Sequence, residues 1–155
     1  MPRVSNAESL HVWIPTNRYY DNGNPAGMDG LNEIIDSNRR DKNMGARIEK
    51  ENVEWCAWHI RQAMAHAGWN PLTKDTACEC IVYMRIVEAN RRRDVSNVYA
   101  GTAKYVLDAC TARHALGVGA IYDDSVRWLS TFVQKIAVDP REPDIDLTII
   151  RYYGR

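Results

Sequence analysis

Alternating apolar residues in one internal segment constrain the fold more than any other feature of the sequence. Between positions 76 and 87 every second residue is apolar, which gives the set Cys78, Cys80, Val82, Met84 and Ile86. Successive side chains of a β-strand point to opposite faces of a sheet, so this set forms one buried face of a strand. Free cysteines are usually buried like small apolar residues, and we expect both cysteines of the set to lie in the core.

Two helices are predicted on either side of this strand from apolar residues spaced three and four apart. The first covers residues 47–67, with Gly68 as its C-cap, and its buried stripe is Val53, Cys56, Ala57, Ile60, Met64 and Ala67. The second begins at Ser96, a good N-cap residue, and runs to about His114. Its packed side is Val98, Thr102, Tyr105, Val106 and Ala109.

The remaining segments complete an α+β fold. Residues 10–15 form a short strand, and residues 126–138 and 145–152 form two more strands around the turn DPREPD. The Asn- and Gly-rich segment from about 16 to 45 is expected to be mostly a mobile loop, with a short helix near 32–37. The order β-α-β-α-β-β indicates two main helices packed on a small mixed sheet.

Length and composition fit one soluble globular domain over residues 1–155. Apolar residues make up 45% of the 155 residues and charged residues 26%, and a chain of this size folds without disulfides. No apolar run is long enough for a membrane helix, and the N-terminus lacks the apolar core of a signal peptide, so we expect a cytoplasmic protein. The four cysteines form no CxxC pair, which argues against a zinc site.

The formal net charge is zero, so the charge of the whole chain does not point to a polyanionic partner. The basic residues nevertheless gather in two clusters, Arg39, Arg40 and Lys42 in the first and Arg91, Arg92 and Arg93 in the second. Such runs usually lie on a solvated surface. The second cluster leads directly into Asp94, and this position beside carboxylates makes contact with a DNA backbone a candidate role.

Polar residues along the second predicted helix form a stripe. Its members are Asn97, Gly101, Lys104 and Asp108, which fall on one side at about 100° per residue. Asp94 precedes the helix N-terminus, where the helix dipole favours an anion, and Asp123 and Asp124 follow in a loop with glycines. If the fold brings that loop beside the start of the helix, carboxylates and a lysine converge near three arginines.

Such a convergence would suit a hard divalent ion, because clustered carboxylates repel one another unless a cation is bound. Mg²⁺ bound by oxygen ligands would polarise a phosphoryl oxygen, and a lysine would stabilise charge on the phosphate, which indicates phosphodiester hydrolysis. Each part also has a plainer interpretation. Asp94 is then only a charge at a helix terminus, and Asp123 with Asp124 is an ordinary polar turn.

Four stretches of this sequence, NRRRDVSN, TAKYVLDA, GAIYDDS and PDIDLTII, together resemble the RusA family of Holliday-junction endonucleases. In that family an Asp-x-Asp-Asn motif precedes a helix with a lysine and a Leu-Asp-Ala-like stretch, and an Asp-Asp pair follows a turn with glycine. The N-terminal VWIPTNRYY resembles the opening strand of the family, and GLNEIIDSNRRDKNMGARIEKE is similar to a form common in phage members. The resemblance therefore covers nearly the whole chain.

The resemblance implies a homodimer that resolves four-way junctions or other branched DNA by paired symmetric nicks, with Mg²⁺ as cofactor and Mn²⁺ as a substitute. It implies that Asp94, Asp123 and Asp124 bind the metal. Asp108 joins them as a ligand or supporting group, and Lys104 acts on the phosphate. The implied DNA contacts are Arg91, Arg92, Arg93, Asn97, Arg39, Arg40 and Lys42.

Two departures from the family pattern leave alternatives open. Ser96 stands where the family has its second aspartate, and the spacing from Asn97 to Lys104 is longer than in short bacterial members. A serine can serve only as a neutral ligand, so one alternative is a junction-binding protein that has lost cleavage. A second alternative is an interaction protein in which the Asp-rich loop is only a solvated turn.

Overall fold

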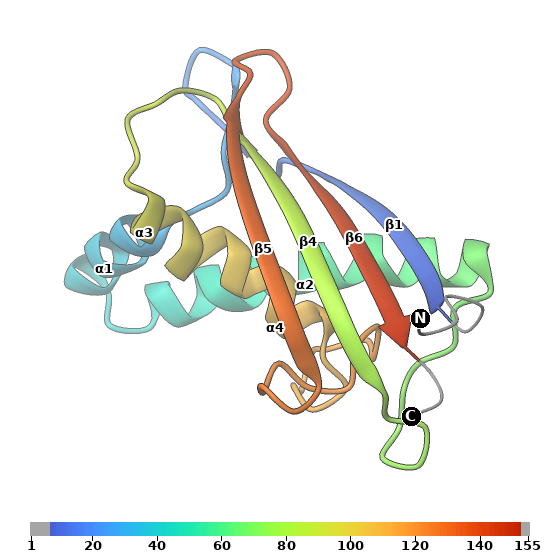
Figure 1. Ribbon diagram of the computed structural model, residues 1–155. Helices are drawn as coiled ribbons and strands as arrows, with labels where there is room; N and C mark the ends of the chain where they lie inside the picture. The colour runs from blue at the N-terminus through green and yellow to red at the C-terminus, as the bar shows by residue number, and fades with distance from the viewer. Residues whose placement is uncertain (1–6, 153–155) are drawn as a thin grey trace.

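A computed structural model describes residues 7–152 as a four-stranded sheet with helices on one face (Figure 1). In sheet order its strands are β1 (Ala7–Pro15), β6 (Asp144–Tyr152), β4 (Glu79–Glu88) and β5 (Leu129–Val138). β6 is antiparallel to both of its neighbours, and β5 is parallel to β4. The sheet is therefore mixed, and the predicted α+β class is confirmed.

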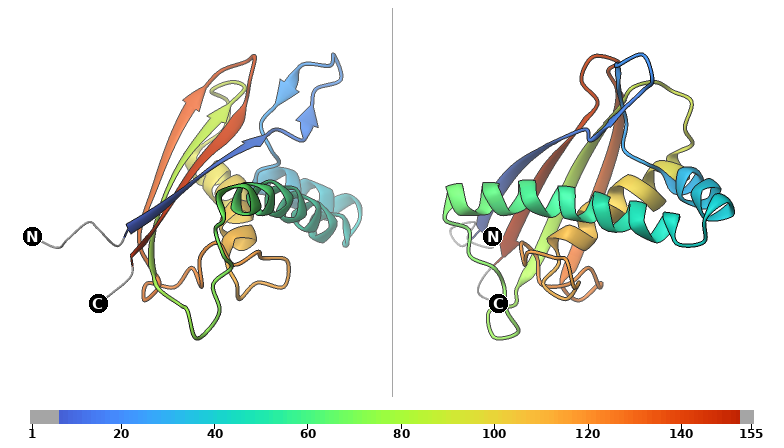
Figure 2. Two further views of the ribbon diagram at one scale, coloured as in Figure 1. Left: turned by 90° about the vertical axis from the view of Figure 1, so that its right-hand side faces the viewer. Right: turned by 180° about the vertical axis from the view of Figure 1, so that it is seen from behind.

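The helical layer contains one long helix that crosses behind the sheet and a second, composite helix packed on it (Figure 2). The crossing helix is α2 (Met44–Ala67). The composite helix, here called the α3–α4 helix, is continuous and consists of α3 (Val95–Val98), the π-helical η2 (Tyr99–Ala103) and α4 (Lys104–Cys110). None of the helices described within residues 7–152 is long and apolar enough to cross a membrane.

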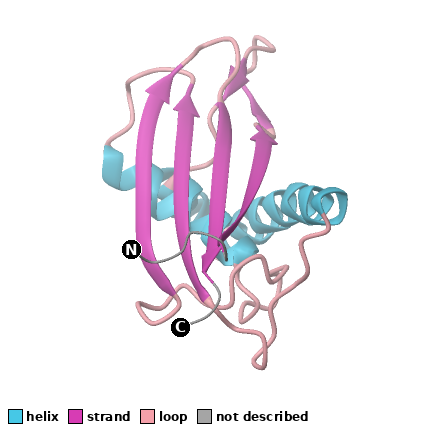
Figure 3. Ribbon diagram, turned by 45° about the vertical axis from the view of Figure 1, so that its right-hand side comes forward, coloured by secondary structure: helices cyan, strands magenta, loops and turns pink. Residues whose placement is uncertain are grey.

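The core lies between these helices and the sheet face that they cover (Figure 3). The five alternating residues of the strand predicted at 76–87 are all buried, and so is the predicted packed side of the second helix. All four cysteines are free and buried, as expected for small apolar residues. Gly68 ends α2 in the left-handed conformation, with φ of 67°, which a glycine adopts without strain.

The boundaries of the second helix differ from the prediction. The helix begins at Val95, and Asp94 occupies the N-cap position that was expected for Ser96. It ends at Cys110 instead of about His114 because Thr111 is extended and forms a parallel bridge with Ile121. The contact that ends the helix is therefore made with a residue ten positions later, which helical periodicity does not report.

The segment from 16 to 45 is more regular than the predicted loop. It contains a short hairpin of β2 (Arg18–Tyr19) and β3 (Pro25–Ala26), followed by α1 (Leu31–Arg40) and the first residues of α2. The prediction of a mostly irregular segment was wrong, although the short helix near 32–37 lies within α1. Ion pairs attach this segment to the rest of the molecule. It therefore folds with few apolar residues.

Candidate functional site

Asp94 lies where the chain leaves the sheet and enters the α3–α4 helix. Its backbone is extended, and its carbonyl accepts hydrogen bonds from the N–H groups of Asn97 and Val98. The side chain is exposed and makes no capping hydrogen bond. The carboxylate thus faces solvent at a helix N-terminus, a position that favours negative charge.

Asp123 and Asp124 lie beyond the other end of the same helix. The chain turns back after Cys110, and the N–H of Ala112 donates to the carbonyl of Ile121 at 3.0 Å. The hydroxyl of Thr111 donates to the carbonyl of Tyr122 at 2.9 Å. These bonds hold the loop against the last turn of α4. Asp123 and Asp124, which follow Tyr122, therefore lie at the C-terminal end of α4.

Arg151 fixes the same loop from the sheet side. Its side chain is fully buried, and the guanidinium donates to the carbonyls of Gly119 and Ala120 at 2.9–3.2 Å. It also stacks on Trp69, with 4.1 Å between the guanidinium carbon and the ring centroid. A buried cation bonded to two carbonyls gives the loop a defined position relative to β6.

The two groups of carboxylates are separated by the length of the α3–α4 helix, roughly 24 Å at the usual rise of 1.5 Å per residue. The predicted convergence does not occur within one chain (Figure 1). The reason is topological: β5 runs parallel to β4, so the helix has to carry the chain back to the end of the sheet where β4 begins. Within residues 7–152 no group of three or more His, Cys, Asp or Glu side chains could hold a metal ion, so the three aspartates of one chain do not fit the expected Mg²⁺ site.

Lys104 and Asp108 do lie together, near the loop that carries Asp123. The Lys104 ammonium is 3.4 Å from a carboxylate oxygen of Asp108. His114 also faces this carboxylate, with its Nε2 at 3.9 Å, and its Nδ1 accepts the N–H of Leu116 at 3.1 Å. The three side chains line a surface pocket of about 210 Å³ between α2 and α4. His114 was not singled out from the sequence, because only the turn after Cys110 brings it back to Asp108.

Asn97 has a structural partner in place of the predicted DNA contact. It is 7% exposed, and its Oδ1 accepts the N–H of Asn32 in the first turn of α1 at 2.8 Å. Next to it, Gly101 is pressed against the backbone of Gly30, so closely that a Cβ at Gly101 would lie 2.6 Å from the Gly30 Cα. Asn97 and Gly101, the first two residues of the predicted polar stripe, therefore attach α1 to the α3–α4 helix. The side chain of Asn97 is buried there and is not exposed to a ligand.

Arg93 is likewise engaged inside the protein. Its side chain is 14% exposed and lies 2.5 Å from Glu33 and 3.5 Å from Glu88, and it donates to the carbonyl of Met28. Arg18 completes the group with contacts to Glu33 at 3.2 Å and Asp29 at 3.7 Å. This ionic cluster joins the segment before α2 to the end of β4, so the guanidinium of Arg93 is not free to bind DNA as predicted.

The ionic cluster shifts the pKa values of two carboxyl groups in opposite directions. Burial raises the pKa of Glu88, and the nearby Arg93 only partly opposes this effect. Burial would also raise the pKa of Glu33, but Arg93, Arg18 and hydrogen bonds from backbone N–H groups at the start of α1 outweigh it and lower that pKa. Neither glutamate was identified from the sequence. Glu33 pairs with Arg93, sixty positions later. Glu88 is only five positions from Arg93, but their contact depends on how the chain turns after β4.

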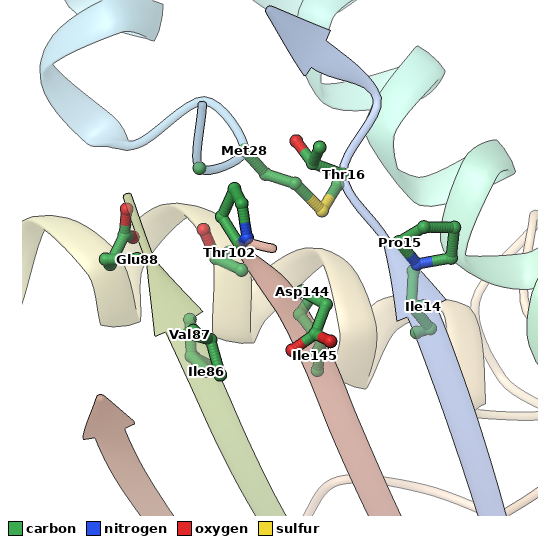
Figure 4. A pocket seen from close by; sticks show the side chains of 12 residues that line it. Ile14, Pro15, Thr16, Met28, Ile86, Val87, Glu88, Thr102, Asp144 and Ile145 are labelled. Atoms are coloured by element: carbon green, nitrogen blue, oxygen red, sulfur yellow. The ribbon is translucent and has the colours of Figure 1, made fainter. Parts of the chain in front are cut away.

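A small pocket lies behind this cluster, where the ends of β1, β4 and β6 meet η2 (Figure 4). Glu88 and Thr102 stand on one side of it and Asp144 on the other. The buried hydroxyl of Thr102 has no hydrogen-bond partner among the described residues. With a volume of about 10 Å³, the pocket has room for one water molecule and none for a substrate.

The other predicted DNA-binding side chains are exposed, namely Arg91, Arg92, Arg39, Arg40 and Lys42. Arg39 is 3.7 Å from Asp36, a contact between two exposed side chains, which holds the arginine weakly. Arg91 and Arg92 precede the α3–α4 helix at the Asp94 end. These five cations remain available to a phosphate backbone.

A scan against models of protein families finds no match for the chain, and a search of curated proteins finds none either. The resemblance to the RusA family is thus carried by the sequence motifs alone.

Proposed function

We propose that this protein is a Mg²⁺-dependent endodeoxyribonuclease that cuts four-way junctions or other branched DNA by paired nicks. Mn²⁺ would substitute for Mg²⁺, and the enzyme would act in the cytoplasm, that of the host if a phage encodes it. One observation carries the proposal: the motifs NRRRDVSN, TAKYVLDA and GAIYDDS follow one another in the order of the RusA family. They fall on one helix and its two flanks, and each flank presents an exposed aspartate.

The proposal requires two copies of the chain. Asp94 and Asp124 of one chain lie at opposite ends of the α3–α4 helix, too far apart to share a metal ion. A homodimer in which each site combines Asp94 of one copy with Asp123 and Asp124 of the other would bring these carboxylates together. Two such sites related by symmetry would also suit paired nicks in two strands.

The remaining residues of the proposed site follow from their exposure. Arg91 and Arg92 precede Asp94 and would bind the DNA backbone, with Arg39, Arg40 and Lys42 extending the positive surface from α1. Lys104 and Asp108 lie at the end that carries Asp124 and would accompany it. We propose no DNA contact for Asn97, which is buried with its Oδ1 bonded to α1, or for Arg93, whose guanidinium is held in ion pairs inside the protein.

The direct test is cleavage of a synthetic four-way junction compared with a linear duplex of the same sequence. Mg²⁺-dependent nicks in the junction that a chelator abolishes are expected from the parent chain and absent from Asp94→Asn. Asp75→Asn, which changes an exposed aspartate in the loop before β4, is the matched control and should cut normally. Equal cutting of both substrates, or full activity of Asp94→Asn, would refute the proposal.

A second candidate is a protein that binds junctions without cutting them. Ser96 favours it, because an exposed serine stands in the first turn of α3 where the family motif has a carboxylate. In that case the parent chain binds junctions tightly and leaves them intact, and Ser96→Asp gains Mg²⁺-dependent nicks. Nicking by the parent chain excludes this candidate.

A further inference from the structure

We infer that a groove on the outer side of α2 binds an arginine side chain from a basic segment of a partner protein. The groove has a volume of about 590 Å³ and is open to solvent. The side chains that line it are Glu51, Glu54, Trp55, Trp58, His59 and Asn17. None of these residues belongs to the proposed nuclease site, so the inference goes beyond the proposed function.

Helical spacing places most of the groove on one face of α2. Glu51, Glu54, Trp55 and Trp58 are three, four and seven positions apart, a spacing that brings side chains to the same side of a helix. Seen from behind, α2 lies in front of the sheet (Figure 2). This face extends roughly 10 Å along the helix axis at 1.5 Å per residue. It matches about three residues of an extended peptide better than a single small cation.

The aromatic side of the groove consists of three rings in contact. Trp58 is 55% exposed. The ring of His59 meets both indoles edge to face, with its centroid 4.8 Å from Trp58 and 4.7 Å from Trp55. The N–H of the Trp55 indole donates to the Pro15 carbonyl at 2.8 Å. These contacts limit the movement of the rings, so little conformational freedom is lost when a ligand binds to them.

The groove carries negative charge. Glu51 and Glu54 are both exposed, and of the two only Glu54 has an ion-pair partner among the described residues, Lys50 at 3.8 Å. That pair joins two exposed side chains and is weak. Burial lowers the pKa of His59, so its ring is neutral at pH 7 and adds no positive charge. The groove therefore attracts a cation and repels the phosphates of DNA.

A guanidinium suits both the indoles and the carboxylates. Cations bind over the face of an indole, and the flat guanidinium also stacks on it, which an ammonium does not do. The fold already contains this contact, with Arg151 over Trp69 at 4.1 Å. A second example is Arg127 over Trp128 at 4.7 Å. Within residues 7–152 no cation covers Trp58 in this way, so an arginine of a partner could stack there and donate to the two glutamates.

The test is titration of a dye-labelled peptide, acetyl-Gly-Arg-Arg-Gly, followed by fluorescence anisotropy at low salt. The parent chain should bind this peptide and should not bind the same peptide with citrulline, which has the shape of arginine without its charge. Trp58→Ala should weaken binding about fivefold, as expected for the loss of a cation–π contact. Trp13→Ala is the matched control, because Trp13 on β1 is 52% exposed, and it should bind like the parent.

A second variant tests the charge of the groove. Glu51→Gln,Glu54→Gln should weaken binding of the arginine peptide and make it less dependent on salt. Glu142→Gln, which changes an exposed glutamate in the loop before β6, should alter neither property. All the substituted side chains are exposed, so each variant should keep a parent-like circular dichroism spectrum.

Four results would overturn the inference. The first is a parent chain that binds neither peptide or binds both equally, and the second is parent-like binding by Trp58→Ala. The third is binding of oligothymidylate to the parent that Trp58→Ala abolishes, which would assign the groove to unpaired bases. The fourth is a parent dimer that Trp58→Ala dissociates, which would assign it to a second copy. The peptide titration contains no DNA, so its outcome does not depend on whether the chain cuts junctions.

Discussion

Asn97 and Glu33 illustrate how single polar residues fix α1 beside the proposed site. The Asn97 amide caps the first turn of α1 from another helix, because its Oδ1 accepts the N–H of Asn32. Glu33, two positions after the start of α1, binds Arg93 and Arg18 and also accepts the N–H of Gly30 at 3.0 Å. Both contacts place α1 against the end of the helix where Asp94 lies.

Asn97→Ala should lower the free energy of unfolding by about 1 kcal/mol, the usual effect of losing a helix cap. Asn97→Asp retains an acceptor oxygen at a helix N-terminus and should recover most of that loss. Urea denaturation of the three proteins measures both effects. The earlier interpretation of Asn97 as a DNA contact predicts a different result, namely parent-like stability and weaker junction binding in Asn97→Ala.

Glu33→Gln should make unfolding less dependent on acid pH. The folded pKa of Glu33 lies below its ordinary value of 4.5, so its ionised form stabilises the fold above about pH 4.5, and this stabilisation is lost as the pH falls through the folded pKa. Glu33→Gln should therefore be about 2 kcal/mol less stable than the parent at pH 7 and nearly equal to it in strong acid. Asp36→Asn, on the exposed side of α1, should follow the parent curve. If Glu33→Gln were less stable than the parent by the same amount at every pH, this explanation would be wrong.

Much of the buried apolar surface could be predicted from the sequence, whereas the ionic cluster could not. Alternation placed Cys80 and Met84 in the core because strand periodicity is a local property. Arg93 pairs with Glu33, sixty positions earlier. The charges of neighbouring residues in the sequence do not indicate a contact between positions so far apart. Three arginines in a row therefore suggested one exposed surface, although the third is mostly enclosed and forms ion pairs inside the protein.

At the scale of elements, the α3–α4 helix is positioned by a close backbone contact. Its π-helical part, η2, holds Gly101 against the segment that leads into α1. A Cβ at this position would lie 2.6 Å from the Gly30 Cα and 2.7 Å from the Asp29 carbonyl oxygen, both of them backbone atoms that do not swing aside. The absence of a side chain at Gly101 lets the two elements approach.

Gly101→Ala should destabilise the protein by about 2 kcal/mol, because the added methyl group forces the two backbones apart. Replacement of glycine by alanine within a helix ordinarily stabilises it by about 1 kcal/mol, so the predicted sign is opposite to that of helix propensity. Thermal and urea denaturation measure the change. A variant as stable as the parent would show that α1 is free to shift away from the α3–α4 helix.

Helices and strands were predicted correctly where the periodicity of apolar residues was strong. They were missed where polar contacts attach the element to the rest of the fold. Both main helices and the four strands of the main sheet were found, with boundaries displaced by a few residues. α1 was mostly assigned to a loop because its attachment depends on Arg18 and Arg93 more than on an apolar stripe. The hairpin of β2 and β3 has two residues in each strand, too few for alternation to be recognised.

At the scale of the whole molecule, strand direction decides what one chain can assemble. The predicted order of elements was compatible with Asp123 and Asp124 lying beside the start of the helix or at its far end. The parallel pairing of β4 with β5 selects the far end, and parallel pairing is a long-range property that the sequence of a single chain does not reveal. The proposed nuclease therefore depends on a second copy, and this dependence can be tested without knowing the interface.

Mixing two inactive variants provides that test. If each site combines Asp94 of one copy with Asp124 of the other, then Asp94→Asn and Asp124→Asn are each inactive as homodimers because every site lacks one carboxylate. A heterodimer of the two places both substitutions in one site and leaves the other site intact. Co-refolded mixtures should therefore regain Mg²⁺-dependent nicking of junctions, and the products should be single nicks in place of paired ones.

The pattern of recovery also reveals how the sites are built. If both carboxylates came from the same chain, each site of the heterodimer would keep one defect and the mixture would stay as inactive as its components. Asp94→Asn mixed with Asp94→Asn,Asp124→Asn is the control, because every site then carries at least the Asp94 substitution in either arrangement. Recovery of single nicks in the first mixture and none in the control would establish a shared site, whereas equal inactivity in both would mean that Asp94 and Asp124 do not act together across two copies.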